Sequence, residues 1–412
     1  MCKIRKEIVS MFHCGAKIAE KEMEETDTFI PLCRTLRPLL VGLTIVGLYH
    51  DKEASRGEGS WIRTRVTMLY HFFITILMIV NALRFIPSFW VGMNYVPALT
   101  IQRVIICTWF IQCAVTSVIL FVMCEKRDHL PAFLEKYNDL MTDDIAKCIK
   151  LKSGCKKLTN YAKIAVSLGT IFMFINVAMN VLLWFLNENF RAATINPLDH
   201  ESLPLTLVCL VPLFYATASW IFPIFFFIGL TCTTCLQFQS LNNIFGKTFK
   251  EDNQSQMACF INLRRKHNQL CKAIDILDRG FRYLIMNYFG TNIFISMFIA
   301  YQLVDNAGSD TMSFTIYMFW LIASIAMILV ISYYCSNVTQ WAQAPLDLAY
   351  DLQLNNVTPQ QLGDLTLFLT RLTVSPVGFT VMGLLTVTKE LVLTLGGIFM
   401  TYFFLLLQFR ID

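Results

Sequence analysis

Seven stretches of the sequence are each long and apolar enough to cross a lipid bilayer as an α-helix. Such a helix needs about 20 consecutive, mostly apolar residues. Apolar residues make up 55% of the chain and charged residues only 15%, whereas soluble domains contain about 25% charged residues. The seven stretches are Thr64–Ile86, Ala98–Met123, Ala162–Leu186, Leu203–Leu236, Tyr283–Val304, Met312–Cys335 and Leu391–Phe409. The sequence therefore predicts an all-α polytopic membrane protein with seven transmembrane helices.

Lysine and arginine are distributed unequally between alternate loops. They are abundant in the N-terminal segment, in the loop after the second span and in the loop after the fourth. The intervening loops contain only Arg84 and Arg191, and the last of them carries Asp305 and Asp310. Because loops rich in lysine and arginine stay in the cytoplasm, we expect a cytoplasmic N-terminus and an extracellular C-terminus at Asp412. This orientation is the reverse of that in a G-protein-coupled receptor.

Several classes of function find no support in the sequence. The net charge of +5 is small and dispersed, and no strip of basic and aromatic residues indicates a nucleic-acid partner. No cluster of histidine or aspartate indicates catalytic residues, so we expect no enzyme and no cofactor. The pair Cys232 and Cys235 has the spacing of a zinc motif, but it lies inside the fourth span without a second pair. We interpret it as two small apolar residues and expect no metal site.

The chain divides into six regions around these spans. A short apolar segment, Leu36–Tyr49, precedes the first span and predicts an interfacial or packed helix. The predicted regions are a cytoplasmic N-terminal segment (1–60), spans one to four (61–240), a cytoplasmic helical loop (241–282), spans five and six (283–340), a cytoplasmic anchor helix (341–376) and span seven (377–412).

The two cytoplasmic helical regions carry apolar stripes. One stripe recurs in steps of three and four residues and leads into span five, which predicts a fifth helix that projects into the cytoplasm. It consists of Phe260, Leu263, His267, Leu270, Ile274, Leu277 and Phe281. The surface that packs against this stripe belongs either to the same chain or to other subunits. We expect it to belong to other subunits. A second helix is predicted to begin at Pro359, after Thr358 as N-cap, and to end at Ser375-Pro376.

The carboxyl-terminal span ends in a short motif, Thr401-Tyr402, five mostly apolar residues, and Gln408-Phe409. Together with the predicted topology, this motif resembles the signature of the insect gustatory receptor family. The resemblance implies a ligand-gated cation channel in the plasma membrane of sensory neurons. It implies a homotetramer, or a heteromer with related receptors, surrounded by membrane lipid. By the same resemblance, the seventh helices of the subunits are expected to line a pore for monovalent and divalent cations. A small-molecule tastant is expected to open this pore.

One position and two alternatives qualify this resemblance. Sugar-sensing members often carry glutamate directly after the Thr-Tyr pair, whereas this chain has Phe403. This difference favours a bitter-type or orphan member. The alternatives are a channel of the related odorant-receptor type and a secondary transporter, but we find no internal repeat between the two halves of the chain and no carboxylate at the middle of a span, as expected for a transporter.

Span seven has the residues of a pore helix. Polar side chains facing lipid are costly, and Thr394, Thr401 and Gln408 recur every seven residues on one face. Four copies around an axis would form rings of hydroxyls and amides, with Leu405 and Phe409 as apolar constrictions that stop flow by dewetting. By the family resemblance, Gln408 and Phe409 lie at the outer gate. The alternative is an ordinary packing helix at the end of the chain.

We expect a ligand pocket that opens outward among spans two to six. Aromatic walls with a few amides and hydroxyls suit small, mostly apolar or amphipathic molecules. The candidate residues are Gln102, Trp109, Asn176, Asn180, Trp184, Tyr215, Trp220, Tyr288, Asn292, Ser296, Tyr317 and Trp320. Tyr288, Asn292 and Ser296 lie four residues apart on one helical face, where each could instead bind a neighbouring helix.

Overall fold

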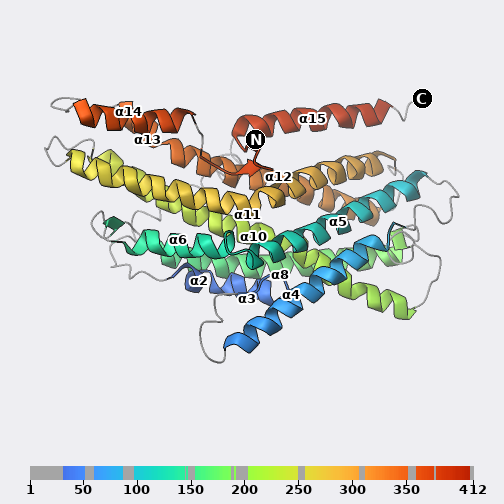
Figure 1. The fold of residues 1–412 in the computed structure, drawn as a ribbon. Helices are drawn as coiled ribbons and strands as arrows, with labels where there is room; N and C mark the ends of the chain where they lie inside the picture. Colours follow the sequence, from blue (N-terminus) through green and yellow to red (C-terminus); the bar gives the residue numbers. More distant parts are fainter. Residues whose placement is uncertain are drawn as a thin grey trace.

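The chain folds into a bundle of long helices that run side by side (Figure 1). The computed structural model describes residues 31–51, 60–86, 97–143, 145–146, 154–186, 190–191, 203–248, 256–305, 311–350, 359–374 and 377–408. Residues 1–30 of the predicted cytoplasmic N-terminal segment and the predicted gate residue Phe409 lie outside these ranges.

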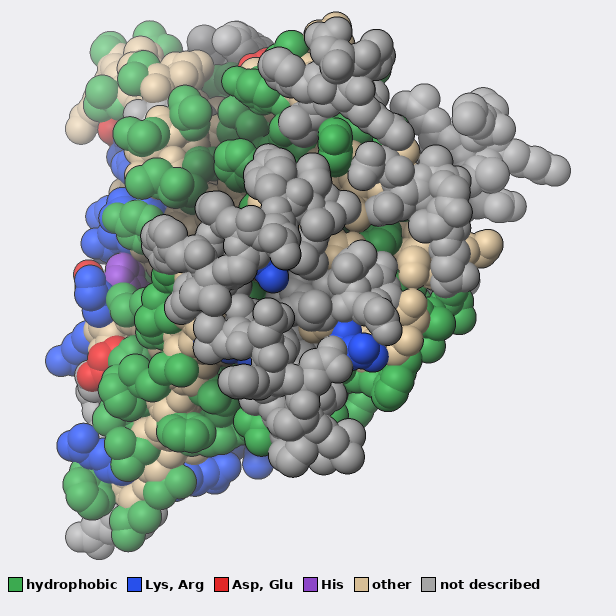
Figure 2. All heavy atoms as spheres, turned by 90° about the vertical axis from the view of Figure 1, so that its right-hand side faces the viewer, with side chains coloured by type: hydrophobic (Ala, Val, Ile, Leu, Met, Phe, Trp, Pro, Cys, Tyr) green, Lys and Arg blue, Asp and Glu red, His purple; other side chains and the backbone are tan. Residues whose placement is uncertain are grey.

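Six helices of the described chain are long and apolar enough to cross a membrane. They are α4 (Ser60–Leu83), α5 (Pro97–Glu125), α8 (Cys155–Leu186), α10 (Leu203–Thr248), α11 (Gln256–Asp305) and α12 (Thr311–Gln343). Seen from one end of the bundle, apolar side chains gather around the edge of the view (Figure 2), and many large apolar side chains are exposed. α5, α8, α10, α11 and α12 each contain one of the predicted spans two to six, and α4 covers all but the last three residues of the first. The predicted seventh span corresponds to α15 (Lys389–Gln408), which is not among the six.

The short apolar segment before the first span forms a packed helix. After the single turn of α2 (Leu32–Thr35), α3 (Arg37–Ile45) lies against α8. Leu39, Leu40 and Leu43 are buried. A Cβ at Gly42 would lie 3.4 Å from a Val166 methyl group of α8, an ordinary van der Waals distance, so the two helices are in contact here. Of the two predicted locations, packing within the bundle is the one observed.

The predicted long fifth helix is present, but the partner of its apolar stripe differs from the expectation. α11 is continuous over 50 residues, and all seven stripe residues are buried within the single chain. Phe260 packs against Phe245 of α10 and Phe368 of α14 (Pro359–Val374). The expectation that the stripe packs between subunits was wrong, because α6 (Leu130–Thr142), α10 and α14 of the same chain already cover it.

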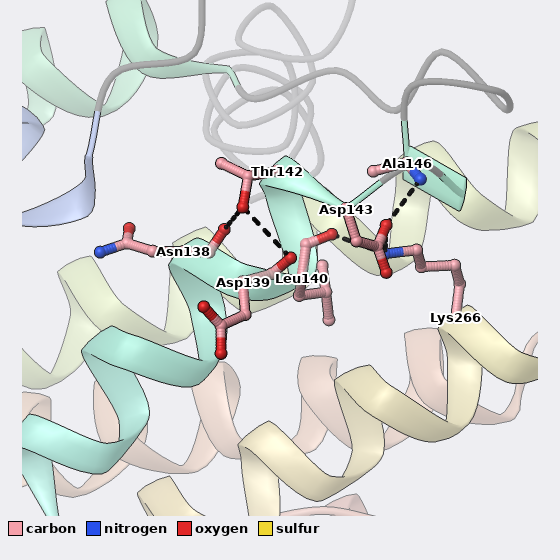
Figure 3. A network of polar contacts seen from close by, with 7 residues as sticks. All are labelled: Asn138, Asp139, Leu140, Thr142, Asp143, Ala146 and Lys266. Atoms are coloured by element: carbon pink, nitrogen blue, oxygen red, sulfur yellow. Dashed lines mark hydrogen bonds and ion pairs between the residues drawn. The ribbon is translucent and has the colours of Figure 1, made fainter.

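A polar network joins α6 to α11 beside this stripe (Figure 3). Lys266 of α11 is almost fully buried, forms an ion pair with Asp143 and donates a hydrogen bond to the Leu140 carbonyl oxygen at 2.7 Å. Burial opposes ionisation of Asp143, but the hydrogen bonds from Lys266 and the Ala146 amide outweigh it and lower the pKa of this carboxyl. A buried ammonium requires such partners, so the network fixes α6 on α11.

The anchor helix begins where the sequence predicts and is followed by a structure that it did not predict. α14 begins at Pro359, after the short α13 (Pro345–Tyr350). A small hairpin, β1 (Thr380–Val381) and β2 (Leu385–Thr386), then precedes α15. Met382 and Gly383 have positive φ of 53° and 78°, as tight hairpin turns require. The all-α expectation is therefore correct for the bundle, and the hairpin is its exception.

Asp278 of α11 fixes this hairpin. Its carboxylate accepts hydrogen bonds from the Thr380 amide at 2.6 Å and from the Thr380 hydroxyl at 2.8 and 3.0 Å. Gly378 lies so close to α12 that a Cβ there would be 2.1 Å from the Thr339 Oγ1 atom. The segment that leads into α15 is thus held by both α11 and α12.

Candidate functional site

A small cavity lies among α5, α8, α10, α11 and α12. Its walls are mostly aromatic and aliphatic, and its volume is about 50 Å³, a few times what one water molecule requires. The lining residues are Gln102, Ile105, Ile106, Trp109, Phe110, Asn176, Asn180, Phe190, Trp220, Ile295, Ile299, Tyr317, Trp320 and Ser324. An apolar enclosure with few polar groups is typical of small-molecule sites.

Polar contacts between helices set the shape of the cavity. Gln102 of α5 donates from Nε2 to the Tyr317 hydroxyl of α12 at 3.1 Å. Trp320 of α12 donates from Nε1 to Asn176 Oδ1 of α8 at 2.8 Å, and Asn176 donates in turn to Thr217 of α10 at 3.1 Å. α12 is therefore bound to two neighbouring helices by the same side chains that face the cavity.

Two polar atoms of the cavity walls remain unsatisfied. Within the described part of the chain, neither Gln102 Oε1 nor Trp220 Nε1 has a hydrogen-bond partner, although both are buried. A buried polar atom without a partner costs about 1–3 kcal/mol. The cavity therefore offers one acceptor and one donor to a molecule that enters it.

The structure brings seven of the twelve predicted pocket residues to the cavity and places five elsewhere. Those at the cavity are Gln102, Trp109, Asn176, Asn180, Trp220, Tyr317 and Trp320. Of the others, Trp184 is buried and Tyr215 forms a 3.0 Å hydrogen bond with Tyr70 of α4. Tyr288 donates to the Trp220 carbonyl oxygen at 2.8 Å, across to α10. Asn292 and Ser296 bond to carbonyl oxygens one turn earlier in α11.

The sequence analysis missed the apolar part of the lining. Ile105, Ile106 and Phe110 follow the helical spacing of Gln102 and Trp109 on α5, so the period of the helix could have identified them. Phe190 comes from a short segment after α8 and lies 5.8 Å from the Trp320 ring. No local signal marks that residue.

The terminal helix α15 lies along the edge of the bundle, in line with α14 (Figure 1). It contacts α11 and α12, and Leu391 and Leu395 pack against the core. Phe403, at the position that distinguishes the sugar-sensing members, is half-buried and stacks on Phe399 with ring centroids 6.3 Å apart. The opposite face is uncovered in the single chain: Leu393 is 78% exposed.

The predicted pore residues lie on this uncovered face. Thr394, Thr401, Leu405 and Gln408 are all exposed. Both threonines donate only to carbonyl oxygens one turn earlier in the helix, at 3.0 and 2.9 Å. α15 therefore presents a row of polar side chains that the described part of its own chain does not cover.

A direct connection links the cavity to the base of α15. α12 carries Tyr317 and Trp320 at the cavity, and at its other end Gln340 accepts a hydrogen bond from Lys389, the first residue of α15, at 3.1 Å. α12 therefore lines the cavity and also contacts the start of the terminal helix.

Comparisons with known proteins agree with this architecture. The chain matches the 7tm chemosensory receptor family over residues 36–412. It also resembles the solved structures of the insect olfactory receptor OR5 from Machilis hrabei. For the complex with eugenol the TM-score is 0.70 at 15% sequence identity, covering 92% of this chain and 98% of the other. For OR5 without a named ligand the TM-score is 0.66 at 14% identity, with the same coverage.

A search of curated protein sequences finds no match. The family match nevertheless covers nearly the whole chain, and the six long apolar helices agree with it. This family consists of receptors rather than enzymes. The chain is therefore a multi-pass membrane protein that belongs to the 7tm chemosensory receptor family and has the fold of an insect olfactory receptor.

Proposed function

We propose that the protein is a gustatory-type chemosensory receptor, a cation channel that opens when a small molecule binds in the cavity between α5, α8, α10, α11 and α12. The observation that carries this proposal is the aromatic cavity with one unsatisfied acceptor and one unsatisfied donor, Gln102 Oε1 and Trp220 Nε1, within the described part of the chain. The complex of OR5 with eugenol supports a small organic ligand in a protein of this fold.

The cavity favours a mostly apolar ligand with one or two hydrogen-bonding groups. A sugar carries many hydroxyls, each of which must find a partner when it leaves water. The walls provide few polar groups. The packed aromatic at Phe403 agrees with this preference, because the position carries no charge. We therefore place the ligand among bitter-type compounds rather than sugars.

Ligand entry requires rearrangement of the walls. A cavity of about 50 Å³ is far smaller than the roughly 300–1,000 Å³ of ordinary ligand pockets. Tyr317 and Trp320 are the natural elements to move, because both rings face the cavity and both are bound to other helices through a single hydrogen bond each. Their displacement would move α12 and, through Gln340 and Lys389, the base of α15.

The pore in this proposal is built from the exposed faces of four α15 helices. Rings of Thr394, Thr401 and Gln408 would contact water and ions, and Leu405 and Phe409 would form apolar constrictions. Thr394, Thr401, Leu405 and Gln408 are exposed in the single chain. This exposure supports the assignment, since polar side chains are costly in lipid. Uncharged amides and hydroxyls discriminate weakly between cations, so we propose a non-selective channel.

Whole-cell current recording against a panel of sugars and bitter plant compounds tests the proposal. Gln102→Leu should raise the half-activating concentration about 5- to 150-fold, as expected for loss of a hydrogen bond worth about 1–3 kcal/mol. The matched control is Gln112→Leu, a buried amide on the same helix that does not line the cavity. Absence of any ligand-evoked current, with normal surface protein, would contradict channel function in the homomer.

A further inference from the structure

We propose that His50, His71 and Cys124 form a zinc site at the junction of α4, α5 and the segment that follows α3. All three residues are buried, and their potential ligand atoms lie within 4.8 Å of one another. Imidazole nitrogen and thiolate sulfur are the ligands that zinc prefers in proteins. The site is independent of the cavity and of the proposed channel function.

The distance between the two histidine nitrogens is close to that in a tetrahedral zinc site. The two Nδ1 atoms of His50 and His71 are 3.0 Å apart. Zinc–nitrogen bonds of about 2.0–2.1 Å at tetrahedral angles place two ligating nitrogens about 3.4 Å apart. Binding therefore requires only a small opening of the two rings. Three protein ligands leave a fourth position for water or a further oxygen ligand.

A carboxylate supports one of the ligands. His50 Nε2 lies 3.5 Å from Glu125 Oε2, on the opposite side of the ring from the Nδ1 atom that faces His71. In zinc sites the second ring nitrogen commonly donates to a carboxylate, which fixes the tautomer and the orientation of the ring. Glu125 lies on the side of His50 where such a carboxylate would bind.

The surroundings favour a cation bound by soft ligands. Phe121 covers both imidazoles, with ring centroids 5.4 Å from His50 and 5.2 Å from His71. The carboxylates of Asp51 and Glu125 lie near the Cys124 thiol. One thiolate and two neutral imidazoles leave a zinc ion with a net positive charge, which these carboxylates balance. A buried charge needs such compensation.

Sequence motifs could not identify this site. The three ligands lie at positions 50, 71 and 124, and they meet only because α4 packs along α5. A rise of about 1.5 Å per residue places Cys124 about 20 Å from Phe110 along α5, so the site is separate from the ligand cavity. A bound ion would add a link among three segments that packing and the Tyr70–Ile45 and Thr75–Ser117 hydrogen bonds already hold together, and it would stabilise the folded state.

Zinc content of the purified full-length protein tests this proposal. The protein is prepared without a histidine tag, incubated with zinc chloride, desalted and analysed by mass spectrometry for metal. We expect about one zinc ion per chain in the wild type, as for a single site of three protein ligands. His71→Gln and Cys124→Ser should each lose most of it, whereas Cys113→Ser, a buried cysteine on the same helix, should retain it.

A second readout covers the case in which a variant folds poorly. Cobalt(II) bound in place of zinc should give a thiolate charge-transfer absorption in the wild type and in Cys113→Ser, but not in the conservative variant Cys124→Ser. Zinc should also raise the apparent unfolding temperature of the wild type and not that of Cys124→Ser. A monodisperse wild type without zinc, or zinc content unchanged in both His71→Gln and Cys124→Ser, would overturn the proposal.

Discussion

The cavity and the terminal helix differ in how their polar side chains are satisfied. At the cavity, Gln102, Asn176 and Trp320 bond to other helices of the same chain. On α15, the hydroxyls of Thr394 and Thr401 bond only within their own helix, and Gln408 is exposed. The single chain therefore completes the cavity but leaves the face of α15 uncovered, as expected if one region binds the ligand and the other requires assembly.

The largest expected effect concerns the apolar stripe on α11, which, like the cavity, is buried within the single chain. Leu277 of α11 is 1% exposed within the single chain. Leu277→Asp would leave a buried, unpaired charge at a cost on the order of 4 kcal/mol or more. We expect no folded protein at the cell surface, measured by surface biotinylation. Lys272→Asp, an exposed position on the same helix, should be tolerated, and normal surface levels of the Leu277 variant would contradict the packing described.

Gln408→Arg should have the next largest effect, and it acts on the terminal helix α15. In the proposed tetramer, four positive charges around one axis would repel cations, and each added barrier of about 1.4 kcal/mol lowers the current tenfold. We expect at least about a tenfold loss of ligand-evoked current at normal surface level. The milder Phe409→Ala should raise current without ligand by weakening an apolar constriction. If α15 is only a packing helix, surface protein falls and the remaining channels behave normally.

Loosening the hairpin that precedes α15 should have an intermediate effect. Asp278→Ala removes the carboxylate that holds Thr380 of the hairpin. Hydrogen bonds to a charged group are worth about 1.5–3 kcal/mol, so we expect the maximal ligand-evoked current to change about tenfold. Asp275→Ala, an exposed carboxylate three residues away, is the matched control. Equal effects of both substitutions would contradict a specific role of the hairpin.

The smallest predicted effect is on stability, at the polar network between α6 and α11 shown in Figure 3. Asp143→Asn leaves the buried Lys266 ammonium without its carboxylate partner. Because Asp143 is partly exposed, the loss should be about 1–3 kcal/mol, below that for a fully buried pair. The Asp143 pKa is lowered in the folded protein, so its stabilisation is present above the unfolded pKa of about 4 and is lost as the pH falls through the folded value.

Thermal unfolding of the purified protein at neutral and acidic pH measures this effect. The difference between wild type and Asp143→Asn should be present at neutral pH and should disappear in acid. Asp139→Asn, an exposed carboxylate on α6, should resemble the wild type at both. An unfolding temperature of Asp143→Asn equal to that of the wild type at neutral pH would contradict the stabilising role of this ion pair.

Local patterns predicted the helices well but not what each face contacts. Apolar runs located the six long helices, and Thr358-Pro359 located the start of α14. The stripe on α11 was recognised, but its period does not state whether its partner belongs to the same chain. The hairpin has strands of only two residues each, and its stability comes from Asp278, about a hundred residues away along the chain.

The candidate site was predicted in part for the same reason. Trp220 lines the cavity and Tyr215 does not, although both lie in the same half of one span. The rotation of α10, which only tertiary packing determines, separates them.

The direction of the chain across the membrane remains a prediction from loop charges. An epitope after Asp412 should be labelled on intact cells, and one before Met1 only after permeabilisation.

The central claim is that ligand recognition and ion conduction belong to different regions of the chain. Currents from Gln102→Leu and Gln408→Ala, recorded with surface protein measured in the same cells, test it most directly. We predict that Gln102→Leu shifts the half-activating ligand concentration and leaves relative cation permeability unchanged, while Gln408→Ala does the reverse. If Gln408→Ala shifts only the ligand concentration, or if neither variant changes either quantity at normal surface level, the division between cavity and terminal helix is wrong.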